Sequence, residues 1–94
     1  MVSSFPLVLF PLGQVYATPG VMDTIEVQDI QFALLRHHSG DWGDICSEDW
    51  ELNNESLLHA GRLVSSYRDS KGKKFWIITE ADRSATTVLL PEEY

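Results

Sequence analysis

Two short polar clusters hold the side chains of this chain that could do chemistry. The first, RHHSGDWGD, runs from Arg36 to Asp44 and contains two adjacent histidines and two aspartates. The second, TEADRSATT, runs from Thr79 to Thr87 and sets an arginine among acidic and hydroxyl side chains. Histidine can exchange protons near neutral pH, and arginine binds phosphate oxygens through two parallel hydrogen bonds. The chain's candidate sites therefore lie in these two clusters.

A nuclease site would combine residues from both clusters. His37 as a general base, with Arg83 and Thr86 around a phosphate, is the minimum set for metal-independent RNA cleavage. A metal site fits poorly, because His37 and the adjacent His38 would point about 100° apart on a helix and could not both bind one ion. We therefore predict no metal ligand and no cofactor, and keep a small metal-independent nuclease as an alternative function.

A protein-binding surface is the preferred use of the same clusters. Tryptophan and arginine dominate the binding energy of many protein interfaces, and the sequence predicts an exposed tryptophan in the glycine-flanked turn of the first cluster. The arginine of the second cluster is expected to form ion pairs with neighbouring acids on a hairpin, and the two clusters are expected to meet at one edge of the fold. The predicted contact residues are Asp41, Trp42, Asp44, Glu80, Asp82 and Arg83.

The charge balance bears on the class of partner. The formal net charge is −7, and the seven Lys and Arg residues are scattered apart from three at positions 71–74. The basic surface that nucleic-acid binding needs is missing, so we expect no direct nucleic-acid partner. An acidic surface suits a basic protein partner, and an acidic anti-defence protein that mimics DNA is a further alternative. The single cysteine, Cys46, excludes an internal disulfide and predicts a reducing, cytoplasmic location.

The chain is expected to form one domain over residues 1–94, with an apolar N-terminal arm at residues 1–12. The arm lacks a basic start, is interrupted by Pro6 and Pro11 and is too short to span a bilayer. We therefore expect neither a targeting signal nor a membrane partner. The exposed apolar side chains of the arm make it a candidate homodimer contact.

Capping residues and periodicity predict three short helices. The Thr-Pro pair at 18–19 opens the first, over 19–25. Asp29 is expected to cap the second helix and Ser47 the third, and a glycine ends each of these two. Asn54 lies on the apolar side of the third helix and is expected to bond the SGDWG turn.

Strand signals occur at 14–17, 62–67, 74–80 and 86–90. The last three are joined by short turns, which predicts an antiparallel three-stranded meander. The strand KFWIITE is apolar on both faces and should lie centrally, with its odd-numbered residues 75, 77 and 79 on one face and residues 76 and 78 on the other. The predicted fold class is α+β, with three short helices packed on one face of a small antiparallel sheet that ends in the meander.

Three segments, FPLGQVYATPG, LLRHHSGDWGD and WIITEADRSATTVLLPEEY, resemble one family of small proteins of unknown function carried on plasmids and other mobile elements. The resemblance covers Phe10 to Tyr94, while the arm MVSSFPLVL is extra and the linker at 26–28 is shorter. It implies a mobile-element accessory role with no established activity. We therefore expect an uncharacterised accessory protein that acts as a non-enzymatic protein-interaction module.

Overall fold

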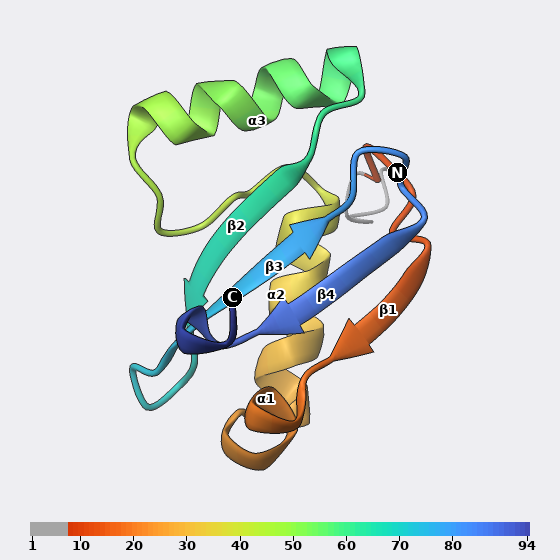
Figure 1. The fold of residues 1–94 in the computed structure, drawn as a ribbon. Helices are drawn as coiled ribbons and strands as arrows, with labels where there is room; N and C mark the ends of the chain where they lie inside the picture. The colour runs from red at the N-terminus through yellow and green to blue at the C-terminus, as the bar shows by residue number, and fades with distance from the viewer. Residues whose placement is uncertain (1–7) are drawn as a thin grey trace, which may run out of the picture.

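A four-stranded sheet backed by one long helix forms the centre of the molecule (Figure 1). The computed structural model describes residues 8–94, so residues 1–7 of the predicted arm lie outside the described part. The predicted α+β class is confirmed. The elements in chain order are β1 (Gln14–Ala17), α1 (Pro19–Thr24), α2 (Val27–His38), α3 (Ser47–His59), β2 (Leu63–Arg68), β3 (Lys74–Thr79), β4 (Ala85–Leu89) and a 3₁₀ turn at Pro91–Glu93.

The sheet is mixed and has the strand order β1-β4-β3-β2. β2 pairs antiparallel with β3, and β3 pairs antiparallel with β4. β1 instead runs parallel to β4, from Gln14 opposite Ala85 to Ala17 opposite Val88. The prediction of an antiparallel sheet is therefore wrong for β1. Three helices and two strands separate β1 from β4 along the chain, so no local turn sets the direction of that pairing.

The predicted N-terminal cap is correct for α1 and wrong for α2. The Thr18 hydroxyl accepts a hydrogen bond from the Val21 N–H at 3.3 Å, which confirms the predicted start of α1. The predicted cap Asp29 is wrong, because α2 begins at Val27 and Glu26 occupies the cap position. The Asp29 carboxylate accepts from the Ser70 N–H and hydroxyl instead, at 3.2 and 3.0 Å.

The third helix also differs at both ends from the prediction. Ser47 is its first helical residue, and Cys46 occupies the cap position without a side-chain hydrogen bond. Ala60, with φ of 55°, takes the left-handed position that a glycine usually fills. The Gly61 N–H then closes the helix end on the Ser56 carbonyl at 3.0 Å.

α2 covers one face of the sheet, and Figure 1 shows it crossing behind the strands. The side chains that alternate inward along β3 lie on this face, as the strand pattern predicts. The buried residues of this core are Val21, Ile25, Ile30, Ala33, Tyr67, Phe75, Ile77, Val88 and Leu90. We call the opposite face, which carries Val64, Ser66, Trp76 and Ile78, the outer face.

α3 does not share the α2 face but lies beside β2 (Figure 1), so the prediction of three helices on one face is not confirmed. A second buried cluster attaches it to the sheet. The cluster consists of Phe10, Trp42 and Leu63, with Leu12, Ile45, Trp50 and Leu57 packed partly buried against them.

Asn53 of α3 fixes the helix to the edge of β2 with both ends of its amide. Its Oδ1 accepts from the Val64 N–H at 3.2 Å, and its Nδ2 donates to the Val64 carbonyl at 2.7 Å. Two residues further along, the Ser66 N–H donates to the Trp42 carbonyl and the Ser66 carbonyl accepts from the Asp44 N–H. The outer edge of β2 is therefore paired by an amide side chain and a loop, which protects it from pairing with another chain.

The Asn53 contact can be tested by substitution, with the adjacent Asn54 as a matched control. Asn53→Asp keeps the acceptor for the Val64 N–H but replaces the donor, leaving a carboxylate oxygen against the Val64 carbonyl. We expect the free energy of unfolding to fall by about 1–3 kcal/mol, because a buried polar group loses its partner. Asn54→Asp adds the same charge to the same helix but keeps the acceptor that Asn54 uses, so it should change stability by less than about 0.5 kcal/mol.

Urea unfolding followed by circular dichroism measures both variants. Equal losses for Asn53→Asp and Asn54→Asp would show that the added charge, rather than the contact with the β2 edge, sets the effect.

Candidate functional site

Trp42, the centre of the predicted binding surface, is fully buried at 0% exposure. Its ring stacks on Phe10 at 6.1 Å between centroids and meets the His37 ring edge-on at 5.5 Å. The indole N–H donates to the Asn54 side-chain oxygen at 3.0 Å, which confirms the predicted bond between Asn54 and the turn. The prediction that Trp42 is exposed is wrong, and Trp42 cannot contact a partner while the chain is folded.

The turn around Trp42 faces inward because it pairs with β2. Gly43 forms an isolated bridge to Ser66 at a φ of +76°, where a Cβ atom would collide with the Ser66 carbonyl. Only glycine fits a position with this φ and this backbone approach. Glycine and aspartate in the sequence indicated a solvated turn, but here they allow the loop to lie flat against a strand.

The two aspartates of the turn have separate ion-pair partners. Asp41 accepts from the Arg36 Nε at 2.8 Å and from the Gly43 N–H at 3.1 Å. The hydrogen bond from Arg36 is the main reason why the pKa of Asp41 is lowered from its ordinary value. Asp44 is exposed and lies 3.4 Å from the Arg68 Nε at the end of β2. Asp41 therefore fixes the turn, while Asp44 stays accessible.

The carboxylates of the hairpin acids contact residues other than Arg83, although the Glu80 carbonyl accepts from the Arg83 Nη1 at 3.1 Å. Glu80 lies 3.9 Å from the Arg62 Nε. Asp82 accepts from the Ser84 hydroxyl and N–H at 2.6 and 3.0 Å, and the hydroxyl contact is the main cause of its lowered pKa. The predicted ion pairs between Arg83 and these two acids are therefore wrong.

Arg83 binds backbone carbonyls at the end of α3. Its Nη1 donates to the Gly61 carbonyl at 2.6 Å and its Nη2 to the Ser56 carbonyl at 2.9 Å. A cation at a helix C-terminus satisfies carbonyls that have no partner within the helix. Arg83 thus joins the final hairpin to α3, and its guanidinium also lies 5.7 Å from the centre of the Phe10 ring.

The six predicted contact residues do not form one patch. Asp44 pairs with Arg68 at one end of β2, and Glu80 pairs with Arg62 just before the other end. Arg62 and Arg68 are six positions apart, which is about 20 Å at about 3.3 Å per residue of extended strand. One exposed patch that contains both Asp44 and Glu80 therefore has no geometric support.

His37 lies in a buried chain of side-chain hydrogen bonds that crosses the sheet. Its Nδ1 is 2.5 Å from the Ser65 hydroxyl, and its Nε2 is 2.8 Å from the Thr79 hydroxyl. The chain continues from Thr79 to the Thr86 hydroxyl at 2.8 Å and ends at the Leu12 carbonyl, which accepts from Thr86 at 2.7 Å. All four side chains, those of His37, Ser65, Thr79 and Thr86, are 0% exposed.

The carbonyl at the end of this chain fixes the direction of every hydrogen bond in it. Thr86 uses its only hydroxyl proton on the Leu12 carbonyl, so Thr79 must donate to Thr86. Thr79 can then only accept from His37, which places the imidazole proton on Nε2 and makes Nδ1 the acceptor for Ser65. Burial lowers the pKa of His37 to about 3, and the charges of His38 and Arg83 act in the same direction. His37 is therefore neutral in the folded chain, with a single tautomer.

The nuclease hypothesis loses its geometric support here. Both hydrogen-bonding nitrogens of His37 are occupied by buried hydroxyls, Thr86 is bonded at both sides, and Arg83 binds carbonyls of the chain. A general base must reach the proton that it removes, and a fully buried imidazole cannot reach a substrate.

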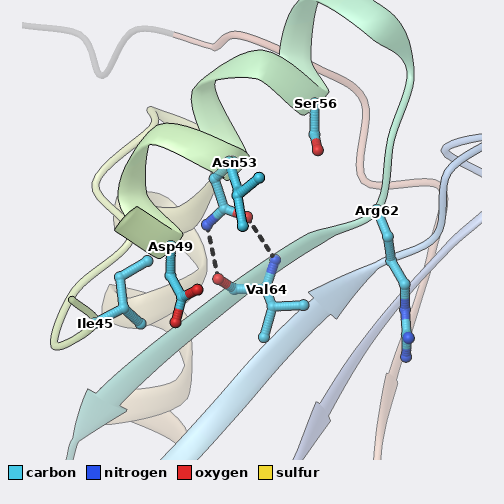
Figure 2. Close-up of a pocket in the computed structure, with 7 residues that line it drawn as sticks. Ile45, Asp49, Asn53, Ser56, Arg62 and Val64 are labelled. Carbon is cyan, nitrogen blue, oxygen red and sulfur yellow. Dashed lines mark hydrogen bonds between the residues drawn. The ribbon is translucent and has the colours of Figure 1, made fainter. Parts of the chain in front are cut away.

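A hollow accessible from outside lies between α3 and β2 (Figure 2). It has a volume of about 450 Å³. Figure 2 shows Asp49 pointing down from α3 toward β2, with the Asn53 amide between the helix and the Val64 backbone, to which it is bonded. The lining residues are Ile45, Asp49, Leu52, Asn53, Ser56, Arg62 and Val64.

A second hollow of about 400 Å³ continues the first across the outer face. The two share Ile45, Asp49 and Val64, so together they form one groove along β2, which we call the α3 groove. The additional lining residues are Asp44, Cys46, Ser66, Lys74 and Trp76. Of the predicted contact residues, Asp44 is the one that lines this groove.

Ser66 stands out in the floor of the α3 groove. It is 4% exposed, and its hydroxyl has no hydrogen-bond partner among residues 8–94. On the wall above, Leu52 is 59% exposed although it is apolar. A buried hydroxyl without a partner costs about 1–3 kcal/mol. A ligand that displaced the side chains covering Ser66 and bonded its hydroxyl would recover that free energy.

Sequence reasoning missed Asn53, Leu52 and Ser66. Periodicity could have identified Asn53, because it lies three residues after Trp50 and four before Leu57 and so shares their side of the helix. No sequence signal marks Ser66, because its lack of a partner depends on the packing of α3 and the 42–44 loop.

Among residues 8–94, no three His, Cys, Asp or Glu side chains gather closely enough to hold a metal ion. The helices of this part of the chain are all too short or too polar to cross a membrane. No protein-family model, curated protein or solved structure matched the chain. The mobile-element resemblance and the DNA-mimic alternative therefore remain predictions.

Proposed function

We propose that this chain is a non-enzymatic protein-interaction module whose α3 groove binds a basic, extended segment of a partner protein. The observation that carries the proposal is the Ser66 hydroxyl, buried without a partner in the floor of an open apolar groove. An accessory role on a mobile element is compatible with this function and rests on the sequence resemblance.

The shape of the groove favours an extended segment. Its two hollows follow β2 from Arg62 to Ser66, so a bound chain would lie along the strand. The backbone edge of β2 is already paired by Asn53 and the 42–44 loop, which excludes recognition by strand addition there. Side chains of the partner must therefore provide the contacts, with apolar groups against the exposed Leu52 and a polar group at Ser66.

The charge around the groove favours a basic segment. Asp44 and Asp49 line it, and α3 carries four acidic residues and no Lys or Arg. Two cations, Arg62 and Lys74, also line it. Arg62 lies against Glu80, and its Nη1 donates to the Tyr94 hydroxyl at 3.0 Å. Complementary charge raises the association rate and selects against acidic partners.

Selection of peptides from a random library displayed on phage, with the full chain as bait, tests the proposal. Selected peptides should be enriched in Lys or Arg next to apolar residues. Leu52→Lys should weaken their binding by more than about tenfold, which corresponds to about 1.4 kcal/mol, because it replaces the apolar wall with a positive charge that repels a basic segment.

Leu58→Lys is the matched control, because Leu58 lies on the same helix, is 81% exposed and is not among the groove residues. It should leave peptide binding nearly unchanged. Peptides that bind Leu52→Lys as tightly as the unmodified chain would show that the α3 groove is not the binding site.

A further inference from the structure

The two edge strands of the sheet differ in how far their backbone groups are covered. The β2 edge is covered by Asn53 and the 42–44 loop, whereas β1 forms the other edge and, among the described residues 8–94, has β4 as its one neighbour in the sheet. β1 is exposed along Gln14, Val15 and Tyr16, with the last two at 45% and 55% exposure. An uncovered strand edge presents N–H and C=O groups that another strand can bind.

The backbone groups that β1 leaves free can be assigned from its pairing. The N–H groups of Gln14 and Thr18 donate to the Ser84 and Val88 carbonyls on the β4 side. Because successive residues of a strand point their backbone groups to opposite sides, Val15 and Ala17 direct theirs to the open edge. The open edge therefore offers two donors and two acceptors in the spacing of a strand ladder.

The surface beside this edge is apolar and uncharged. A hollow of about 380 Å³ lies between α2 and the segment that leads into β1, and it is lined by Leu12, Gln31, Leu34, Leu35 and His38. Neither this lining nor β1 itself contains an Asp, Glu, Lys or Arg residue. In a chain with a net charge of −7, two copies can approach through this surface without placing like charges opposite one another.

We infer that β1 pairs with β1 of a second copy, antiparallel, across a two-fold axis that passes beside Tyr16. In this register Val15 of one copy faces Ala17 of the other, and each such pair exchanges both backbone hydrogen bonds. The two Tyr16 rings then lie directly opposite one another on the outer face, as a cross-strand aromatic pair. The two α2 helices lie on the same face of the joined sheet, so their two apolar hollows face each other across the axis.

This interface is separate from the α3 groove, which lies at the opposite side of the sheet, along β2 and β3. The dimer therefore presents two grooves on its two outer sides. The inference does not rest on the proposed function, and either can fail without the other.

Sedimentation of the full chain over a range of concentrations tests the inference. The unmodified chain should reach twice the monomer mass, and Tyr16→Glu should dissociate more than about tenfold more readily, because two carboxylates then lie directly opposite one another. Leu58→Glu on α3 should dimerise as the unmodified chain does. An equimolar mixture of Tyr16→Glu and Tyr16→Lys should recover the dimer as a heterodimer, since position 16 faces itself across the axis.

Hydrogen exchange of the unmodified chain gives a readout that needs no variant. The N–H groups of Val15 and Ala17 should become protected as the concentration rises. A chain that stays monomeric at millimolar concentration, or a dimer in which these two amides exchange as fast as in the monomer, overturns the inference. The inference is also overturned if the Tyr16→Glu variant dimerises as tightly as the unmodified chain.

Discussion

Trp42→Ala is expected to lower the free energy of unfolding by about 3–5 kcal/mol, as large aromatic truncations in a packed core do. The side chain is 0% exposed and its ring contacts Phe10 and His37, so its removal leaves a cavity at the centre of the second cluster. It also leaves the Asn54 side-chain oxygen without its indole donor. Because small domains are stable by only about 5–15 kcal/mol, a large part of the variant's stability would be lost.

Urea unfolding followed by circular dichroism measures this effect. Phe32→Ala is a suitable control, since it truncates an aromatic side chain that is 65% exposed and should change stability by less than about 0.5 kcal/mol. If the two variants unfold at similar urea concentrations, Trp42 is not part of the core and the burial described above is incorrect.

Acidification from pH 7 to pH 5 is expected to lower the free energy of unfolding by about 2 kcal/mol through His37 alone. The folded chain holds this imidazole neutral, with a pKa of about 3, while the unfolded chain protonates it near the ordinary pKa of 6.5. Protons therefore bind preferentially to the unfolded chain, so stability that is present above pH 6.5 is lost as the pH falls toward 3. The lowered pKa values of Asp41, Asp82 and Glu93 add their losses at lower pH, because carboxyls of the unfolded chain titrate near pH 4.

The variant His37→Gln separates this effect from general acid sensitivity. It is less stable at pH 7, because the amide cannot reproduce both contacts to Ser65 and Thr79, but it lacks the titrating imidazole. Its stability should therefore fall much less between pH 7 and pH 5 than that of the unmodified chain. A variant with the full acid-induced loss would assign the pH dependence to other groups.

Capping residues and side-chain alternation in the sequence predicted most of the helices and strands. The Thr-Pro pair at 18–19 defined the start of α1, and the alternation of KFWIITE correctly assigned the two faces of β3. These signals act within a few residues, so a single sequence contains them in full. The cap of α2 was misassigned because two acids, Glu26 and Asp29, lie near its start, and Asp29 bonds the distant Ser70.

Long-range pairing accounts for what the sequence did not reveal. The parallel contact between β1 and β4 joins segments about 70 residues apart, and no turn residue encodes it. Trp42 was predicted to be exposed because glycines and aspartates surround it, yet the same glycines let its loop pair with β2. Phe10 was assigned to an arm, but it is 6% exposed and packs against Trp42 and His37.

Long-range packing also explains why the candidate site in the structure differs from the predicted one. The sequence ranked residues by the chemistry of their side chains, which favoured Trp42, His37 and Arg83, and the fold uses all three internally. The α3 groove arises instead from a helix held beside β2 by the second buried cluster and by the Asn53 amide. Its floor contains a serine, and its wall contains a leucine that a helical pattern alone does not distinguish from a core residue.

Titration of the ¹⁵N-labelled full chain with a selected peptide, followed by amide and indole chemical shifts, locates the peptide-binding surface. We expect the largest shifts along the α3 groove, at Asp49, Leu52, Val64 and Ser66 and at the Trp76 indole. Shifts confined to the 80–84 hairpin or to the free edge of β1, with Ser66 unchanged, would contradict this expectation.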